Sequence, residues 1–407
     1  MKSTSALHSI SDLHALQAAW RAISKRNKLS RGSDKVTIKA FSSNLDSNLR
    51  AISSDLRSKT YQFSKLRPAV VAKPGSDKPR PIQIPAVRDR VVMKALALHI
   101  RPSFAKFDLP CSFAFIAGKD RGVKAAIGQI KDLVDEGYIH YFEADIKNFF
   151  GAVERPRLWK MFSKQVRQRS LLPLLEKCFN MELDDLESYQ SEHQDIFLGA
   201  TIGIPQGGVL SPMLANYYLY EFDKTITANG FRLIRYADDF VVMCKTREEA
   251  GRAHTLCRTI LGNLGLEIHA LDEPQSKSRF GNFSKDGLSF LGVRFEGHVT
   301  YPNSKVVKRF QEKITAILRP SSGDSLSKTL QSLANLIKGW GMGYRDMRVT
   351  KLYGELDSFI KEEVVKYLRH SGVHLQSRNR GKQMRFLGVP SLSAMVLHSN
   401  DTSSRSS

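Results

Sequence analysis

Three aspartates at the ends of apolar segments are the residues best placed to do chemistry. Asp145 follows the run YIHYFEA, whose aromatic and β-branched residues predict a strand. Asp238 and Asp239 lie between the apolar segments 232–235 and 240–244, a pattern typical of a β-hairpin. If these strands are neighbours in one sheet, we expect the three carboxylates to meet at one edge of it.

Clustered carboxylates repel one another unless cations neutralise them. Mg²⁺ prefers oxygen ligands and is typically held by one or two carboxylates together with substrate phosphates. Two such ions about 4 Å apart activate an attacking 3′-oxygen and stabilise a leaving pyrophosphate. The alternative is that Asp238 and Asp239 serve only as turn residues, to which Asp is well suited. The apolar flanks weaken that alternative, because buried strands fix the direction in which both acids project.

The remaining pattern predicts the elements that must position these acids. Five prolines keep residues 67–85 extended. Residues 288–295 predict a strand or hairpin. Apolar spacing predicts helices over 8–25, 37–57, 87–101, 155–166, 170–181, 209–228, 246–264, 304–319, 325–345 and 350–369. This order fits a βαββ-type α+β unit with helical flanks.

The charge of the chain is unevenly distributed. The 407 residues include 62 Lys and Arg against 40 Asp and Glu, a net charge of +22. Residues 1–90 have a net charge of +12 and residues 301–407 of +10, whereas the residues between them sum to zero. Such an excess is typical of proteins that bind nucleic acid. We expect the basic ends to hold the polyanion and the neutral middle, where a positive field would compete with Mg²⁺, to do the chemistry.

Composition excludes several classes of protein. A hydrophobic content of 42% is too high for a disordered polycation. The chain has no run of about 18 apolar residues and no apolar stretch of the signal-peptide kind, so neither a membrane protein nor a secreted one is expected. The four cysteines form no CxxC pair, which predicts free thiols in a reducing cytoplasm rather than a zinc site or disulfides.

Motifs around the aspartates resemble those of reverse transcriptases. Five segments carry the resemblance, and they occur in the same order as in that family. The first two are the fingers motif, RPIQIP with RDRVV (80–92), and the first catalytic-Asp motif, FEADIKNFF (142–150). The other three are the PQG box GIPQGGVLSP (203–212), the YxDD box YADD (236–239) and the primer grip Phe290-Leu291-Gly292. The resemblance covers about residues 20–370 and is strongest to group II intron-type bacterial enzymes. Gly32-Ser33-Asp34 resembles their N-terminal extension, and the segment from Ile337 to Arg345 resembles their thumb or maturase helices.

This resemblance implies a right-hand polymerase of the α+β class, with fingers, an RRM-like βαββ palm and a helical thumb. It implies an N-terminal extension and fingers at 1–125, a palm at 126–300 and a thumb at 301–370. Residues 371–407 are basic and Ser-rich. They are expected to form a loose tail.

The resemblance also implies roles for residues of the palm. Asp145 and Asp238 are expected to bridge two Mg²⁺ ions, which Mn²⁺ can replace, with Asp239 assisting and Ile146 lending a backbone carbonyl. Phe150 matches the steric gate that excludes a 2′-hydroxyl and so selects deoxynucleotides. The alternative for Phe150 is an ordinary core residue.

Further residues match the nucleotide-binding motifs of the family. Gln206 and Gly207 are expected against the incoming nucleotide and template base, because Gly lets the backbone approach the base pair. Arg80 is expected to bind the triphosphate, since a guanidinium pairs with phosphate oxygens bidentately. Either Lys73 or Lys78 is expected beside it.

Residues that follow the YxDD box complete the expected site. Lys277 is either the general acid for pyrophosphate or a solvated charge. Tyr236 is expected at the primer end. Trp340, Tyr344 and Arg345 belong to the expected thumb, where Trp340 is interpreted as a core residue rather than a stacking platform.

The predicted function is that of an RNA-directed DNA polymerase, which uses dNTPs to make cDNA on a structured RNA template. No zinc-type Cys/His cluster follows residue 370, the NAxxH and VTG signatures of retron enzymes are absent, and the PQGG box argues against diversity-generating enzymes. These features, with the Gly-Met-Gly before Tyr344, favour a stand-alone, defence-associated enzyme that copies a companion noncoding RNA. One alternative is a group II intron-encoded reverse transcriptase and maturase without an endonuclease domain. The other is a non-catalytic RNA-folding cofactor, against which the presence of all three acids argues.

Overall fold

The structure, a computed structural model, describes residues 5–23, 25, 27–72, 79–187, 194, 196–197, 203–271, 273, 276–319, 325–347, 349–374 and 380–395. The chain forms two compact units, Met1–Phe280 and Gly281–Ser407. Helices and sheets of two, four and three strands confirm the predicted α+β class. The four cysteines are free and buried. Within the described part, no helix combines the length and apolar character needed to span a membrane.

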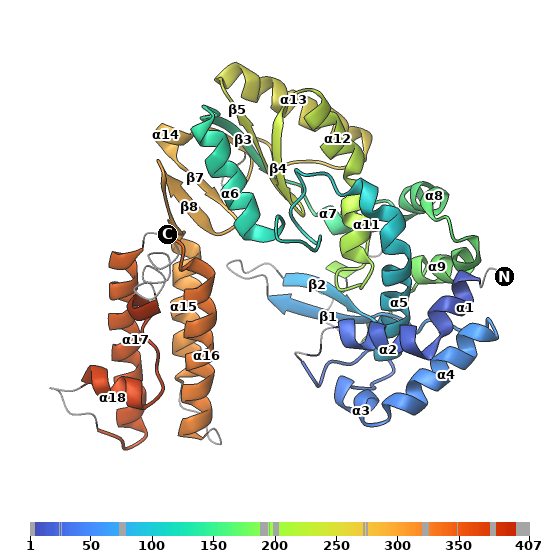
Figure 1. The fold of residues 1–407 in the computed structure, drawn as a ribbon, viewed down its shortest axis with the longest axis horizontal. Coiled ribbons are helices and arrows are strands. Elements are labelled where there is room, and N and C mark those ends of the chain that lie inside the picture. Colours follow the sequence, from blue (N-terminus) through green and yellow to red (C-terminus); the bar gives the residue numbers. More distant parts are fainter. Residues whose placement is uncertain are drawn as a thin grey trace, which may run out of the picture. The chain divides into compact units, whose positions relative to one another are not determined.

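The first unit is built on a four-stranded sheet (Figure 1). Its strands, in order across the sheet, are β4 (Arg232–Tyr236), β5 (Asp239–Cys244), β3 (His140–Asp145) and β6 (Arg279–Asn282). Strand β5 pairs antiparallel with both β4 and β3, and every residue of β5 after Asp239 is buried. Helices α12 (Tyr220–Ala228) and α13 (Arg247–Asn263) pack together and against these strands. The end of this sheet is therefore held rigidly by a covered central strand.

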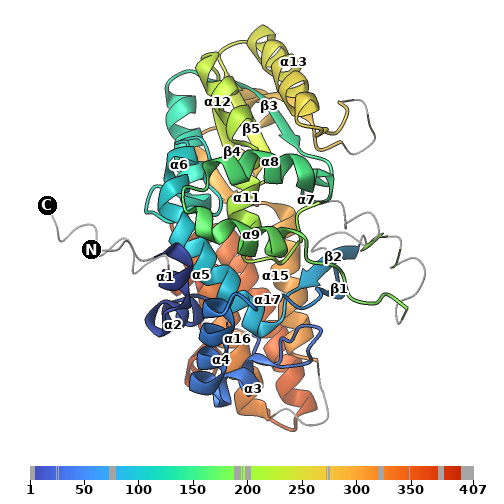
Figure 2. The same cartoon turned by 90° about the vertical axis from the view of Figure 1, so that its right-hand side faces the viewer.

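The N-terminal helices gather around α5 (Val87–Phe104), as Figures 1 and 2 show. They are α1 (Ala6–Ser11), α2 (Leu13–Ala22), α3 (Ile38–Ser43) and α4 (Leu45–Arg57). The extended segment predicted at 67–85 is the hairpin of β1 (Arg67–Ala72) and β2 (Pro79–Ile84). The other helices of this unit are α6 (Gly122–Asp135), α7 (Phe149–Ala152), α8 (Arg155–Gln165), α9 (Leu172–Phe179) and α11 (Ser211–Tyr218).

Several details differ from the predicted elements. The helices expected over 37–57 and 209–228 are each divided, the first at Asn44 into α3 and α4 and the second at Leu219 into α11 and α12. The single helix expected over 8–25 is divided into α1 and α2, because Asp12 leaves the helical conformation and its carboxylate accepts from the His14 amide as the N-cap of α2. Helix α6 is absent from the predicted set, although its buried residues Ile127, Ile130 and Leu133 have helical spacing.

The second unit has its own core. It begins with the short helix α14 (Phe283–Asp286) and the antiparallel strands β7 (Leu288–Phe290), β8 (Val293–Glu296) and β9 (Val299–Pro302). Its helices are α15 (Ser304–Ile317), α16 (Leu326–Tyr344), α17 (Thr350–His370) and α18 (Arg380–Phe386). The three long ones run alongside one another in Figure 1. The second unit begins at Gly281, whereas the predicted thumb begins at residue 301. The difference arises because strands β7 to β9 belong with the helices that follow them. The Asn303 amide, at the start of α15, donates to the Gly292 carbonyl in the turn between β7 and β8 at 2.9 Å.

The C-terminal segment is packed, which corrects the expectation of a loose tail for residues 380–395. The Asp357 carboxylate on α17 accepts hydrogen bonds from Ser391 Oγ at 2.8 Å and from the amides of Leu392 and Ser393 at 2.8 and 3.0 Å. The Leu392 side chain is completely buried. The segment also explains one glycine of Gly-Met-Gly, because a Cβ on Gly341 would lie 2.6 Å from Met395 Sδ and 2.9 Å from Leu392 Cδ2.

Substitution of Asp357 by Ala is expected to release this segment. The change leaves two backbone amides and a hydroxyl without their acceptor, so the free energy of unfolding should fall by about 1–3 kcal/mol. Amide hydrogen exchange of Leu392 and Ser393, together with thermal melting, measures the effect. Asp346→Ala is the matched control, since its ion pair with Arg345 is half-exposed at 3.6 Å and should contribute little. Unchanged protection of the Leu392 and Ser393 amides in Asp357→Ala would contradict the role assigned to this contact.

Candidate functional site

The three aspartates meet at one end of the four-stranded sheet. Asp145, the last residue of β3, is the register partner of Asp239, the first residue of β5. Asp239 also pairs with Tyr236, so Ala237 and Asp238 form a two-residue loop between β4 and β5. The Ile146 amide donates to the Asp238 carbonyl at 3.1 Å, which fastens this loop to the end of β3. Strand pairing alone thus brings together the acids that lie 93 or more positions apart in sequence.

Repulsion and burial dominate the electrostatics of these acids. Asp145 is 7% exposed, and Asp238 and Asp239 are half-buried. Burial and then the charge of Asp145 raise the pKa of Asp238. Burial, followed by the charges of Asp145 and Asp238, raises the pKa of Asp239 to about 7. A divalent cation among these oxygens would relieve both effects, so the donor set fits Mg²⁺.

An ammonium group lies where such a cation would bind. Lys277 Nζ is in contact with Asp145 Oδ2, and His269 Nε2 lies 3.8 Å from the same oxygen. Within the described residues, no three His, Cys, Asp or Glu side chains already stand at metal-ligand spacing. The arrangement is that of a carboxylate cluster neutralised by Lys277, and a metal ion on Asp145 would have to displace this side chain.

Two residues beside Asp145 were not among the predicted site residues. His269 Nδ1 lies 3.3 Å from Glu273 Oε2, and Lys147 Nζ donates to Glu273 Oε1 at 2.7 Å. A backbone hydrogen bond also joins these two segments, since the Lys147 amide donates to the Glu267 carbonyl at 2.7 Å. His269 and Glu273 come from the segment after α13, whose Ile268 forms an antiparallel bridge with Ile146, the residue that follows β3. The sequence carries no motif that signals them.

The PQG segment begins against the helix that carries Phe150. The Ile204 amide donates to the Phe150 carbonyl at 2.7 Å. A Cβ on Gly203 would lie 1.9 Å from that carbonyl oxygen and 2.6 Å from the Gly151 Cα, so only glycine fits here. The Phe150 ring is half-buried and lies 5.3 Å from the Phe149 ring, edge to face. One part of the ring therefore packs on the core and another remains accessible.

The next residues of the PQG segment contact the fingers strand β2. The Gln83 amide donates to the Gln206 carbonyl at 2.8 Å. Gly207 has φ +113°, and a Cβ there would lie 3.0 Å from the Gln83 carbonyl oxygen. The close approach of Gly207 to the backbone of Gln83 thus favours glycine at this position. The predicted approach to a base pair would be a second reason. Arg80 lies on the same strand and is exposed. Burial raises the pKa of Asp238, and the positive charge of Arg80 opposes this effect only in part. The predicted residues Lys73 and Lys78 lie outside the described residues.

The remaining predicted residues belong to the second unit. Leu291 (φ +51°) and Gly292 (φ +82°) form the two-residue turn between β7 and β8, and a Cβ on Gly292 would meet Val306 Cγ2 at 2.9 Å. Phe290 is buried. Trp340 is half-buried and stacks on Phe310 with ring centroids 4.4 Å apart.

Two neighbours of Trp340 were predicted with it. Tyr344 lies 4.8 Å from the Trp340 ring, and burial raises its pKa. Arg345 is exposed beside Asp346. Tyr344 therefore extends the aromatic core of this unit, whereas Arg345 presents a charge to solvent.

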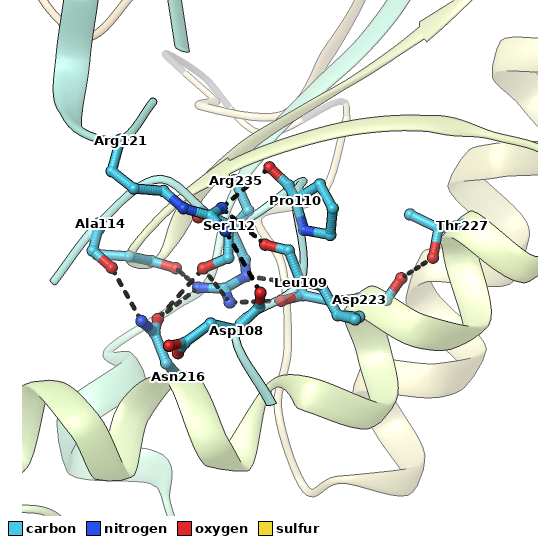
Figure 3. Close-up of polar contacts among 11 residues, drawn as sticks. Asp108, Leu109, Pro110, Ser112, Ala114, Arg121, Asn216, Asp223, Thr227 and Arg235 are labelled. Atoms are coloured by element: carbon cyan, nitrogen blue, oxygen red, sulfur yellow. Dashed lines mark hydrogen bonds and ion pairs between the residues drawn. The ribbon is translucent and has the colours of Figure 1, made fainter. Parts of the chain in front are cut away.

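The sequence motifs miss the buried ion pair of Arg235 with Asp223 (Figure 3). Arg235 directly precedes the YADD box, and each side chain of the pair is 1% exposed. A signal does exist in the sequence: an arginine within the apolar strand Leu233-Ile234-Arg235-Tyr236 needs a buried acceptor. The sequence does not show that Asp223 supplies it.

Two family descriptions match the chain. That of the reverse transcriptase (RNA-dependent DNA polymerase) matches residues 71–295, more than half of the chain. That of the group II intron maturase-specific domain matches residues 307–386. The first match contains all three aspartates, the PQG segment and the primer-grip turn.

Several proteins of known sequence or structure are similar. Protein YkfC of Escherichia coli is 27% identical over 353 residues, which are 74% of this chain and 87% of YkfC. The group II intron-encoded protein LtrA of Lactococcus lactis is 28% identical over 182 residues, 44% of this chain; these span only 28% of LtrA. Among solved structures, a partial Cas6-RT-Cas1–Cas2 complex has 25% identity and a TM-score of 0.38, with coverage of 64% of this chain and 42% of that chain. Telomerase of Candida albicans has 12% identity and a TM-score of 0.40, with coverage of 81% and 64%.

Proposed function

The chain belongs to the reverse transcriptase (RNA-dependent DNA polymerase) family, and on that premise we propose that it makes cDNA on a structured RNA template by two-metal-ion nucleotidyl transfer in the cytoplasm. The observation that carries the proposal is the convergence of Asp145, Asp238 and Asp239 at the end of one sheet, inside the matched region. A vestigial polymerase would be expected to have lost at least one of these acids. This argues against a purely non-catalytic RNA-folding role.

The residues of the site divide the chemistry among them. Asp145 and Asp238 would hold two Mg²⁺ ions, with Asp239 and the Ile146 carbonyl beside them. When bound, such ions supply activation of a 3′-hydroxyl and stabilisation of the leaving pyrophosphate. Lys277, displaced from Asp145, has an Nζ proton to give to the pyrophosphate oxygen.

The incoming dNTP is proposed to bind between the fingers strand β2 and the PQG segment. Arg80 is exposed on β2 and presents a guanidinium suited to the triphosphate. The hydrogen bond from the Gln83 amide to the Gln206 carbonyl keeps this strand in register with the PQG segment. This contact supports the proposal that Gln206 and Gly207 contact the nascent base pair.

The template is proposed to be recognised by its shape and its phosphates, as A-form helices generally are. The basic residues that could contact phosphates are concentrated in residues 1–90 and 301–407. Selection of one RNA then depends on its folded structure, which the two basic parts of the chain contact.

Replacement of Phe150 by Val is expected to admit ribonucleotides. A smaller side chain no longer contacts the 2′ position of the sugar, so the preference for dNTPs over rNTPs should fall by about 10- to 100-fold or more, the range that differential steric contacts supply. Single-nucleotide incorporation with dNTP and rNTP measures the ratio. Phe149→Leu is the matched control, because Phe149 is buried and should change stability but not the ratio. An unchanged ratio in Phe150→Val would make Phe150 an ordinary core residue.

Two RNAs are proposed as the natural template, and they imply different biological roles. A companion noncoding RNA would place the enzyme in bacterial antiviral defence. An intron RNA would make it a group II intron reverse transcriptase and maturase. The matched maturase-specific domain and the intron-encoded relatives support the second role. The glycine at position 341 no longer favours the defence role, because its close packing against Leu392 and Met395 explains why a glycine is needed there.

Two experiments test these proposals. Primer extension by the purified chain on an RNA template, with dNTPs and Mg²⁺, tests the activity, and the absence of product would refute it. Sequencing of the RNA and DNA that co-purify with the protein from its host tests the role. Intron RNA as the main species would refute the defence role, whereas a distinct noncoding RNA with its cDNA would refute the intron role.

A further inference from the structure

Arg235 and Asp223 form a bidentate ion pair inside the palm (Figure 3). Arg235 Nε donates to Asp223 Oδ1 at 2.6 Å, and Nη2 donates to Oδ2 at 2.5 Å. Both side chains are 1% exposed. Asp223 lies on α12 and Arg235 on β4, so the pair joins a helix to the strand that leads into the YADD box.

The other three donors of this guanidinium also have partners. Nη2 donates to Ser112 Oγ at 2.9 Å, and Nη1 donates to Asn216 Oδ1 at 3.2 Å and to the Ala237 carbonyl at 3.0 Å. A guanidinium has five N–H groups, and each of the five is thus used. The geometry is fully determined, because no alternative orientation of the group could satisfy all of these acceptors.

The partners hold three distant segments together. The Arg235 amide donates to the Cys111 carbonyl at 2.8 Å, and the Phe113 amide donates to the Arg235 carbonyl at 2.9 Å. Asn216, on the helix that follows the PQG segment, donates from Nδ2 to the Ala114 carbonyl at 2.8 Å. Arg235 therefore connects segment 111–114 and helix α11 to the turn that carries Asp238.

Stability alone does not account for a buried ion pair of this kind. Well-packed apolar side chains of similar volume often stabilise a protein as much as a buried ion pair does, because they avoid the desolvation of two charges. They could not replace the hydrogen bond to the Ala237 carbonyl. Ala237 has φ +60°, an unfavourable conformation for a residue with a Cβ, and this carbonyl belongs to the peptide group that joins it to Asp238.

We propose that Arg235 is a positioning residue that fixes the peptide group between Ala237 and Asp238 and thereby directs the Asp238 carboxylate toward the metal site. The inference rests on the proposed polymerase function. It goes beyond it by assigning a role to a residue that contacts neither substrate nor metal.

The double variant Arg235→Met with Asp223→Leu tests the proposal, since it keeps the volume and leaves no buried charge unpaired. It should still melt cooperatively, although Ser112, Asn216 and the Ala237 carbonyl lose a donor and the melting temperature falls accordingly. Its rate of nucleotide addition and its affinity for Mn²⁺, titrated by electron paramagnetic resonance, should each fall by about 10- to 100-fold, as expected when an outer-shell contact is lost. Binding of a primer–template duplex should be unchanged. The Mn²⁺ binding that is lost in the variant Asp238→Ala is the binding at this site, and Mn²⁺ binding that remains in that variant occurs elsewhere.

Arg235→Lys provides a second variant, because Lys keeps a charge beside Asp223 but cannot reach all five acceptors. Tyr218→Phe is the matched control: it removes another buried palm hydrogen bond, from Tyr218 Oη to the Leu264 carbonyl at 2.6 Å, which does not involve the turn. The control should keep both the wild-type rate and the wild-type Mn²⁺ affinity.

Three outcomes would overturn the proposal. They are full rate and Mn²⁺ affinity in either folded Arg235 variant, equal losses in Tyr218→Phe, and loss of cooperative melting in both Arg235 variants, which would make the pair purely structural. A wild-type chain that binds Mn²⁺ through Asp238 but extends no primer would refute the proposed function alone. The Mn²⁺ titration would then still decide the role of Arg235.

Discussion

Asp238→Ala is expected to lower the rate of primer extension at least about 1000-fold, a loss of about 4 kcal/mol of transition-state stabilisation. The reason is that Asp238 and Asp145, which meet at the end of the sheet, are the proposed ligands of the divalent cations. The rate of a single nucleotide addition at saturating dNTP and Mg²⁺ measures the effect. Affinity for the primer–template duplex should change little, because we propose that the basic parts of the chain supply the phosphate contacts.

The fold should survive this substitution. Burial and the neighbouring Asp145 raise the pKa of Asp238, which means that its ionised form is disfavoured in the folded state. Removal of one of three mutually repelling carboxylates should therefore leave the melting temperature at neutral pH unchanged or higher. Glu221→Ala is the matched control, since Glu221 is an exposed acid of the same unit and should keep the wild-type rate. Undiminished extension by Asp238→Ala would refute the assignment of the metal site.

Gly203→Ala is the second substitution with a large expected effect. The added Cβ would lie 1.9 Å from the Phe150 carbonyl oxygen, so the PQG segment and helix α7 must move apart. Overpacking against backbone costs about 1–3 kcal/mol of stability or more. A shift of about 1 Å in a positioning segment can lower a rate about 100-fold. Melting temperature and the rate of nucleotide addition should fall together.

A second glycine provides the comparison. Gly251 lies within helix α13, and no atom lies within 4 Å of a Cβ built on it. Gly251→Ala should therefore raise the melting temperature slightly, because Ala is favoured over Gly inside a helix by about 0.5–1 kcal/mol. If Gly203→Ala behaved like Gly251→Ala, the close packing of the PQG segment on α7 would not be a requirement of the active fold.

The central part of the site could be predicted from the sequence because its determinants are local. Tyr236 and Asp239 are paired and enclose a two-residue turn between apolar strands. The whole pattern is contained within about a dozen consecutive residues. The strand that ends at Asp145 is equally local. Their meeting at one edge depended on the two segments being neighbours in one sheet, and the antiparallel pairing of β3 with β5 supplies this.

Contacts between distant segments could not be predicted in this way. Arg235 finds acceptors at Ser112, Asn216 and Asp223, and no spacing in the sequence relates the three. The packing of residues 389–395 was missed for the same reason, because it depends on Asp357 of α17 and on the absence of a side chain at Gly341. Composition alone suggested a loose tail there.

The sequence by itself predicted which acids form the candidate site, the strands and turn that present them, and the family to which their motifs are similar. Those features depend on short-range periodicity and on backbone preferences of neighbouring residues. Only the tertiary structure decided how the site is held together: by the five side-chain hydrogen bonds of Arg235, by the fit of Gly203 against Phe150 and by the contact of Lys277 with Asp145. The physical reason is that a buried donor must find an acceptor wherever the fold brings one, and a local sequence pattern does not contain that information.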